Sequence, residues 1–308
     1  MRSGKNSQPR RREPPLVAGG GLSSLGMSSD TGSEQEPGPV LRPTRALAAA
    51  IVPFLLAGFA ILYLAPDRTG DLFAWTIRPR MTAMMLGASY LGGAYFFVRA
   101  AVARRWRQVE IGFLPVALFA TALGISTIVH WSKFNHSHPA FWVWTALYLT
   151  TPVLVTAAWW ANRRSSAGVG AIEPHLDRAL RVALGVIGGV VLLVAVGLFA
   201  APQAVGPAWP WALTPLTARV MASLFAVGGA SLVGMAVDGR PDAIHVTLHS
   251  QVLSLAAIAA AIPFAWSGTR TDTVLPGLFA IAMVALLFGT AGLAWALRPQ
   301  LSEQAAPA

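Results

Sequence analysis

The chain has 308 residues, of which 55% are hydrophobic and only 12% are charged. A soluble domain carries roughly a quarter charged residues, so this composition excludes an ordinary soluble protein and indicates an integral membrane protein. The net charge of +10 does not predict a nucleic-acid partner, because the basic residues lie in the connections between apolar segments rather than on one binding face.

Taken in chain order, the sequence predicts two tails, two membrane units and a linker. Residues 1–42 are rich in Ser, Gly, Pro and charged residues, and we expect a disordered cytoplasmic tail. A four-helix repeat follows at 45–164, a cytoplasmic linker at 165–177, a second four-helix repeat at 178–300 and a short C-terminal tail at 301–308. A helix of about 20 residues crosses the hydrocarbon core of a bilayer. Eight apolar stretches have that length: 46–64, 81–101, 111–131, 140–161, 179–201, 216–237, 243–265 and 275–297.

The two membrane units resemble each other. Residues of the first unit return, weakly but in register, 136 positions later: Trp75 returns as Trp211 and Pro79 as Pro215. Four spans return the chain to the side on which it started, so both units have the same orientation. The predicted fold is therefore all-α, with eight transmembrane helices as two parallel four-helix repeats and a pseudo-twofold axis along the membrane normal.

The distribution of basic residues predicts the orientation. Lys and Arg are more frequent in the N-terminal tail and in the connections that follow residues 101 and 161 than in the connections on the opposite side. The positive-inside rule then places both termini in the cytoplasm. Arginine greatly outnumbers lysine, which favours a bacterial source and hence the bacterial inner membrane.

Small residues at four-residue spacing mark the second and sixth spans. Such residues allow transmembrane backbones to approach closely. We therefore expect these two spans at the centre of the packing, possible neighbours across the pseudo-axis. The residues are Ala83, Gly87, Ala88 and Gly92 in one span and Ala222, Ala226, Ala230 and Gly234 in the other.

The best-preserved repeated element lies outside the apolar spans, at 73–79 and 209–215. One interpretation is an interfacial segment that starts the next span, because Trp favours the headgroup level and Pro favours the first turn of a helix. The other is that the two loops frame a ligand groove on the exoplasmic face. Its candidate ligand-binding residues are Trp75, Pro79, Trp209, Trp211 and Pro215.

The run from Trp209 to Arg219, W-P-W-A-L-T-P-L-T-A-R, resembles a segment of uncharacterised multi-pass integral membrane proteins of actinobacteria and related bacteria. The first copy departs from this pattern, with Phe73 in place of the first Trp and Ile77-Arg78 before the proline. The resemblance implies a multi-pass membrane protein and no particular activity.

No acidic residue lies inside the apolar spans; Glu110, Asp238 and Asp242 border their ends. Ion-coupled transporters and proton pumps usually need carboxylates at membrane depth, so this pattern weighs against that class. The sequence contains no cysteine, which excludes thiolate metal sites and cysteine nucleophiles.

The seventh span begins with polar residues. His245 and His249 are four positions apart and share one helix face, and Gln251 follows nearby. Glu110 occupies the matching end of the third span, so these residues could form a proton-responsive or ligand-binding group at the membrane interface. The alternative is a pair of interfacial histidines that bond to water and helix carbonyls.

His130, His136 and His138 cluster in the connection between the third and fourth spans. A His-x-His spacing can bind zinc or copper, with Asp67 or Asp71 as an oxygen ligand, but such clusters are common by chance and we predict no metal site. No catalytic triad, nucleophile elbow or phosphate-binding glycine loop is present, so we predict no catalytic residue and no cofactor.

These observations favour a non-enzymatic membrane module that binds a small apolar or amphipathic molecule or a lipid, or allows it to pass through the bilayer. A structural or accessory subunit, with another membrane protein as its partner, is the alternative. A metal or redox enzyme that uses the histidines is less favoured.

Overall fold

The computed structural model describes residues 38–166 and 176–298. The predicted N-terminal tail up to residue 37, the middle of the predicted linker and the predicted C-terminal tail lie outside these residues. Within the described part, regular secondary structure is helical, and the sole bridge between extended segments joins Pro39 and Arg105.

Eight helices of the described part are long and apolar enough to cross a membrane, as the sequence predicts. Short helices and helical turns lie between them. The long helices are α1 (Arg42–Phe59, continued by the π-helical turn η1, Ala60–Leu64), α3 (Arg80–Val102), α4 (Glu110–Val129), α5 (Pro139–Ser165), α6 (Arg178–Ala200), α8 (Pro215–Asp238), α9 (Pro241–Ala265) and α10 (Leu275–Ala296). The short elements are η2 (Pro66–Arg68), α2 (Thr69–Leu72), η3 (Trp106–Gln108), η4 (Trp131–Lys133), α7 (Pro202–Val205), η5 (Gly206–Ala208) and η6 (Trp266–Gly268).

Most helix ends lie within one or two residues of the predicted ends, and α5 shows why some differ. It continues to Ser165, four residues past the predicted end. The guanidinium of Arg163 lies 5.1 Å from the ring of Trp159, and that of Arg164 lies 3.5 Å from the ring of Trp160. Cation–π pairs at this i, i+4 spacing stabilise the last turn beyond the apolar segment.

Local chemistry explains where the helices begin and end. Proline occupies one of the first two positions of α1, α5, α8, α9 and α10. A backbone N–H at these positions has no acceptor within the helix, so proline, which lacks the N–H, removes no hydrogen bond there. The Thr214 and Thr217 side chains form a capping box at the start of α8. Gly239 ends α8 with φ of 72°, a left-handed conformation that glycine adopts without steric penalty.

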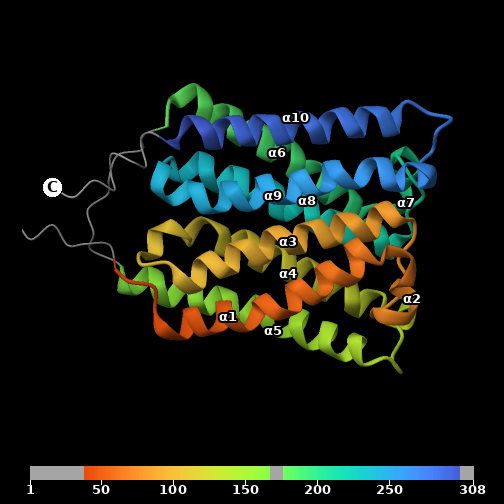
Figure 1. Cartoon of the computed structure of the whole chain (residues 1–308), viewed down its shortest axis with the longest axis horizontal. Coiled ribbons are helices and arrows are strands. Elements are labelled where there is room, and N and C mark those ends of the chain that lie inside the picture. Colours follow the sequence, from red (N-terminus) through yellow and green to blue (C-terminus); the bar gives the residue numbers. More distant parts are fainter. Residues whose placement is uncertain (1–37, 167–175, 299–308) are drawn as a thin grey trace, which may run out of the picture. The chain divides into compact units, whose positions relative to one another are not determined.

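The long helices lie side by side and pack in pairs (Figure 1). In sequence-adjacent pairs, α1 packs on α3 and α6 on α8, while α4 packs on α5 and α9 on α10. Across the middle, α3 packs on α9 and α4 on α8. The predicted central helices α3 and α8 are among the most buried, but each has its main partner across the middle in α9 or α4, with little contact between them.

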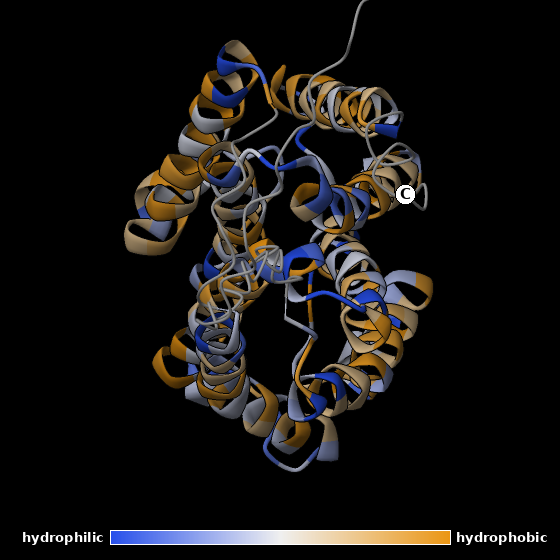
Figure 2. Ribbon diagram, turned by 90° about the vertical axis from the view of Figure 1, so that its left-hand side faces the viewer, coloured by the Kyte–Doolittle hydropathy of each residue, from blue (hydrophilic) through white to orange (hydrophobic). Residues whose placement is uncertain are grey.

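The connections gather at two ends, which are visible in Figure 1. We call one the α2–α7 end; it contains residues 65–79, 130–138, 201–214 and 266–274. We call the other the terminal end; it contains residues 38–41, 103–109, 176–177, 239–240 and 297–298. Apolar residues predominate along the helices, and hydrophilic segments are most frequent at helix ends and connections (Figure 2). This pattern is typical of membrane-spanning helices.

Candidate ligand-binding cavity

The predicted tryptophans of the α2–α7 end are buried rather than turned toward an open groove. The Trp75 ring lies 4.9 Å from that of Trp144 on α5, and the side chain is 4% exposed. Trp211 is 1% exposed and donates its indole N–H to Thr82 Oγ1 on α3 at 2.9 Å. Trp209 packs edge-on against Phe225 of α8 at 5.5 Å. These rings attach the two loops to the helix bundle, and their role as ligand contacts stays a prediction.

A cleft of about 690 Å³ does lie between the two loops. Pro79 lines it, together with residues of the second loop such as Leu213 and Thr214; Trp75, Trp209, Trp211 and Pro215 do not. Arg80 and Asp67 line the same cleft and pair with each other, with 2.6 Å between Nε and Oδ1. Of the five residues predicted to line a groove, only Pro79 lines this cleft. Pro215 is the first residue of α8 and directly follows Thr214, which lines the cleft.

The predicted polar pair lies at the terminal end, on the first turns of α9. His245 Nδ1 lies 2.9 Å from the Asp242 carbonyl oxygen, and His249 Nδ1 lies 2.7 Å from the His245 carbonyl oxygen. Each histidine thus uses one ring nitrogen on its own helix. Among the described residues, Glu110 forms no hydrogen bond or ion pair with either histidine, and it interacts electrostatically with Arg240, Arg163 and Arg107 instead. The function of this group stays a prediction.

The three histidines of the α2–α7 end each have a protein partner. His138 Nδ1 accepts a hydrogen bond from the Ala140 N–H and caps α5, and the His136 ring packs on Phe141. His130 Nε2 lies 2.7 Å from Arg219 Nη1 on α8. Within the described residues, no group of three or more His, Asp or Glu side chains lies close enough to hold a metal ion.

The pKa of His130 is lowered below its usual value, mainly because burial disfavours the charged imidazolium and also because Arg219 and Lys133 repel it. The hydrogen bond between Arg219 and His130 also requires a neutral imidazole. A guanidinium can only donate, so His130 Nε2 must accept and carries no proton. His130 is thus a neutral structural residue that connects α4 to α8.

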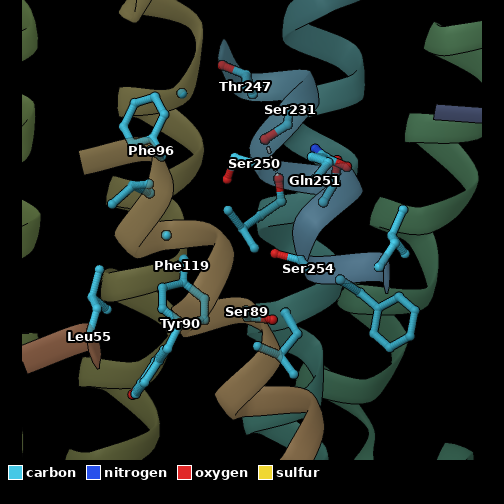
Figure 3. Close-up of a pocket in the computed structure, with 18 of the residues that line it drawn as sticks. Leu55, Ser89, Tyr90, Phe96, Phe119, Ser231, Thr247, Ser250, Gln251 and Ser254 are labelled. Atoms are coloured by element: carbon cyan, nitrogen blue, oxygen red, sulfur yellow. Dashed lines mark hydrogen bonds between the residues drawn. The ribbon is translucent and has the colours of Figure 1, made fainter. Parts of the chain in front are cut away.

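The main candidate site is a cavity of about 200 Å³ within the bundle. Residues from each of the eight long helices line it, such as Ile258 of α9. Figure 3 shows Leu55 of α1, Phe96 of α3 and Phe119 of α4 in its wall. Most of the wall is apolar. None of the described residues that line the cavity is acidic, basic or histidine. Phe54, which is 45% exposed on α1, also lines it, so the cavity lies beside a side chain of the exposed surface of α1.

Polar groups in the wall are hydroxyls and one carboxamide. Figure 3 shows Ser250, Ser254 and Gln251 on α9, with Ser231 on the neighbouring α8. The Ser250 hydroxyl donates to the Gly92 carbonyl oxygen of α3 at 2.7 Å, and Gln251 Nε2 donates to the Gly228 carbonyl oxygen at 3.3 Å. Thr247 also lines the cavity; its Oγ1 is fully buried and has no hydrogen-bond partner among the described residues.

Two adjacent glycines of α8, Gly228 and Gly229, have different surroundings. Gly228 lines the cavity, and a Cβ at this position would meet no atom within 4 Å. At Gly229 a Cβ would lie 2.8 Å from the Gly188 carbonyl oxygen, because α6 and α8 cross closely there. One glycine thus faces open space, and the next permits helix contact.

Of the predicted site residues, only Gln251 belongs to this cavity. The sequence contains a signal for the rest of its polar wall: Thr247, Ser250, Gln251 and Ser254 follow the i, i+3, i+4, i+7 spacing of one helix face. The apolar wall has no comparable signal, because its residues come from all eight helices and look like any other membrane-spanning segment.

Comparison with protein-family models, with curated proteins and with solved structures found no match to this chain. The resemblance of the Trp209–Arg219 segment to other multi-pass proteins therefore stays a prediction. The geometry of the cavity is the basis for a functional proposal.

Proposed function

We propose that this protein is a non-enzymatic membrane module that binds, or allows passage of, a small apolar or amphipathic molecule in its central cavity. The observation that carries the proposal is the cavity itself, to which all eight long helices contribute and whose wall is mainly apolar and, among the described residues, uncharged. Ligand sites are typically concave and mainly apolar, with a few placed polar groups that orient the ligand. The α9 side chains provide such groups.

Access from the bilayer fits this function. Phe54 belongs both to the cavity wall and to the exposed surface of α1. An apolar molecule dissolved in the lipid would reach the cavity beside this ring without crossing water. The cleft at the α2–α7 end, framed by Pro79 and Thr214, is a second candidate entrance from the predicted exoplasmic side.

The helix positions support the proposed pair of parallel repeats. α1 and α6 begin 136 residues apart, at Arg42 and Arg178, and so do α5 and α10, at Pro139 and Leu275. The contact of α3 with α9 has its counterpart in that of α8 with α4. A pseudo-twofold axis along the membrane normal would pass through the middle of this arrangement. Residues 136 positions apart also line the cavity together: Leu55 and Val191, Phe96 and Leu232, Phe119 and Leu255, Leu147 and Met283.

Charge supports the proposed orientation, with the terminal end in the cytoplasm of a bacterium and the protein in its inner membrane. Basic residues are more frequent at the terminal end than at the α2–α7 end. When the adjoining helix turns are counted with the connections, the terminal end has Arg42, Arg45, Arg99, Arg104, Arg105, Arg107, Arg163, Arg164, Arg178, Arg181, Arg240 and Arg298, and the α2–α7 end has Arg68, Arg78, Arg80, Lys133, Arg219 and Arg270.

The experiment that tests the proposal is native mass spectrometry of the protein after mild detergent extraction. We expect the parent to carry a small molecule. Gly228→Leu should lose it, because the new side chain enters the open space of the cavity. The matched control is Gly289→Leu on the exposed face of α10, where a Cβ also meets no atom within 4 Å and which does not line the cavity.

Retention of the same small molecule by Gly228→Leu would contradict binding in this cavity. A parent that carries a stoichiometric partner chain and no small molecule would favour the accessory-subunit alternative. Bound metal would favour the histidine-based alternative.

A further inference from the structure

We propose that the ligand of the central cavity is an uncharged amphipathic molecule whose hydroxyl or carbonyl group binds to the polar face of α9. We define this polar face as Thr247, Ser250, Gln251 and Ser254. The hydrocarbon part of the ligand lies against the aromatic and aliphatic wall. This inference rests on the proposed function and specifies the chemistry of its ligand.

The polar face is directed into the bundle. All four of its residues line the cavity, and the Ser250 hydroxyl reaches the Gly92 carbonyl oxygen across the α3–α9 contact. At a rise of about 1.5 Å per residue, the face extends for about 10 Å along α9. It is therefore long enough to bind one polar group of a ligand and to orient the remainder along the helix.

Hydrogen-bonding capacity remains free on this face. Thr247 is only 3% exposed, and its hydroxyl has no partner among the described residues. Ser250 donates its hydroxyl proton to a carbonyl, so its oxygen lone pairs can still accept. Gln251 has one weak bond through Nε2 at 3.3 Å, so its carboxamide oxygen can accept as well.

The absence of charge from the wall selects against ions. No residue that lines the cavity in the described part of the chain carries a charge. A carboxylate, phosphate or ammonium group would lose its hydration shell there without gaining a counter-ion, which is strongly unfavourable at membrane depth. A neutral hydroxyl or carbonyl loses much less, because hydroxyls of α9 replace its water partners.

The apolar wall sets the size of the ligand. A cavity of roughly 150 Å³ with an apolar lining holds benzene, and the present one is somewhat larger, about 200 Å³. It therefore accommodates a ring with a short substituent or one segment of a longer chain, the remainder of which would leave beside Phe54.

The polar face belongs to one half of the bundle only. In the proposed repeat, the corresponding positions of α4 are Ile111, Leu114, Pro115 and Leu118, which are all apolar. A ligand with a single polar end can bond to this face in only one orientation, with that end toward α9.

The test uses an octanol that carries an aliphatic diazirine, bound to the full-length protein in lipid nanodiscs and photolabelled. Peptide mapping should find the label on cavity residues. 1-Octanol should compete for labelling, whereas octanoate and octane should compete at least about tenfold less well. Octanoate tests the exclusion of charge, and octane tests the need for a hydrogen-bonding group.

Variants assign the effect to the polar face. Thr247→Val, Gln251→Leu and Ser254→Ala should each weaken competition by 1-octanol about threefold to tenfold, as expected for the loss of one hydrogen bond. Competition by octane should not change. The control is Thr150→Val on α5, whose exposed hydroxyl bonds to the Ala146 carbonyl oxygen of its own helix and does not line the cavity.

The outcomes separate this inference from the proposed function. Equal competition by octane and 1-octanol, with label in the cavity, would overturn the inference and leave the proposed function intact. Effective competition by octanoate would overturn the exclusion of charge. Label found only outside the cavity would overturn both. If a variant does not fold, the comparison of the three competitors on the parent protein still decides the inference.

Discussion

Single polar side chains connect helices that are distant in sequence. Asn162 of α5 donates to Thr44 Oγ1 at 2.5 Å and accepts from the Leu41 N–H at 2.9 Å, and so holds the start of α1. The hydroxyls of Tyr90 and Tyr148 lie 2.6 Å apart and join α3 to α5. In an apolar interior such bonds orient helices that dispersion alone would leave free to rotate.

His130 should make the stability of the protein depend on pH. Its pKa is lowered in the folded state, so the unfolded state binds more protons as the pH falls below the ordinary value for histidine, about 6.5. The contribution of the neutral ring is fully present above that value and is lost as the pH falls from it through the lower pKa of the folded state. We expect the melting temperature to decrease between pH 7 and pH 5, and to decrease less in His130→Gln, which has no proton to gain.

Thermal unfolding in detergent at several pH values measures this effect. His136→Gln is the control, because it replaces a more exposed imidazole of the same connection. Parallel pH profiles for the parent and His130→Gln would contradict the assignment of a neutral, structurally coupled His130.

At the scale of elements, small residues decide which helices touch. Gly92 permits the α3–α9 contact: a Cβ there would lie 1.9 Å from Ser254 Oγ and 2.6 Å from the Ser250 carbonyl oxygen. Gly229 permits the α6–α8 contact in the same way, against the backbone of Gly188. A backbone atom cannot move away as a flexible side chain can, so these positions require glycine.

Gly92→Leu and Gly229→Leu should therefore each destabilise the protein. Overpacking typically reduces stability by about 1–3 kcal/mol, and the backbone contacts place both variants at the upper end of that range or above it. The measurement is the melting temperature of the extracted protein, with Gly289→Leu as the control for a leucine on an open face. Melting temperatures equal to the parent's in both variants would show that these faces do not pack.

At the scale of the whole membrane unit, the two halves are joined through their central helices, and an ion pair adds to this contact. Arg107 Nη2 lies 2.7 Å from Asp242 Oδ2, with side chains 10% and 24% exposed. Because α3 packs on α9 and α4 on α8, neither half buries its central helices without the other. The cavity lies among the same helices, so its shape depends on both halves.

The orientation of this unit in the membrane is testable by cysteine labelling, because the chain has no native cysteine. Ala208→Cys, exposed at the α2–α7 end, should react with a membrane-impermeant maleimide in intact cells. Ser165→Cys, exposed at the terminal end, should react only after the cells are opened. The reverse pattern would show that the terminal end faces outward.

Much of the architecture follows from the sequence, because hydropathy and charge act locally. A run of about 20 apolar residues must form a helix in a bilayer to satisfy its backbone, so the eight long helices and most of their ends were predictable. Small residues spaced by four also predicted the burial of α3 and α8, because small side chains allow helix backbones to approach closely. The alternation of basic connections predicts an orientation without any knowledge of packing.

Tertiary structure decided which residues share a site. His130 and Arg219 are 89 positions apart, and no local pattern predicts their contact. Gly228 and Gly229 are adjacent and chemically identical, yet one faces a cavity and the other a helix backbone. Trp75 and Trp211, predicted at a groove, pack into the bundle because aromatic rings of α5 and a hydroxyl of α3 are available to them. A cavity exists where side chains from distant segments do not fill the space between helices. The volume left open depends on how all the helices pack together and not on any one segment.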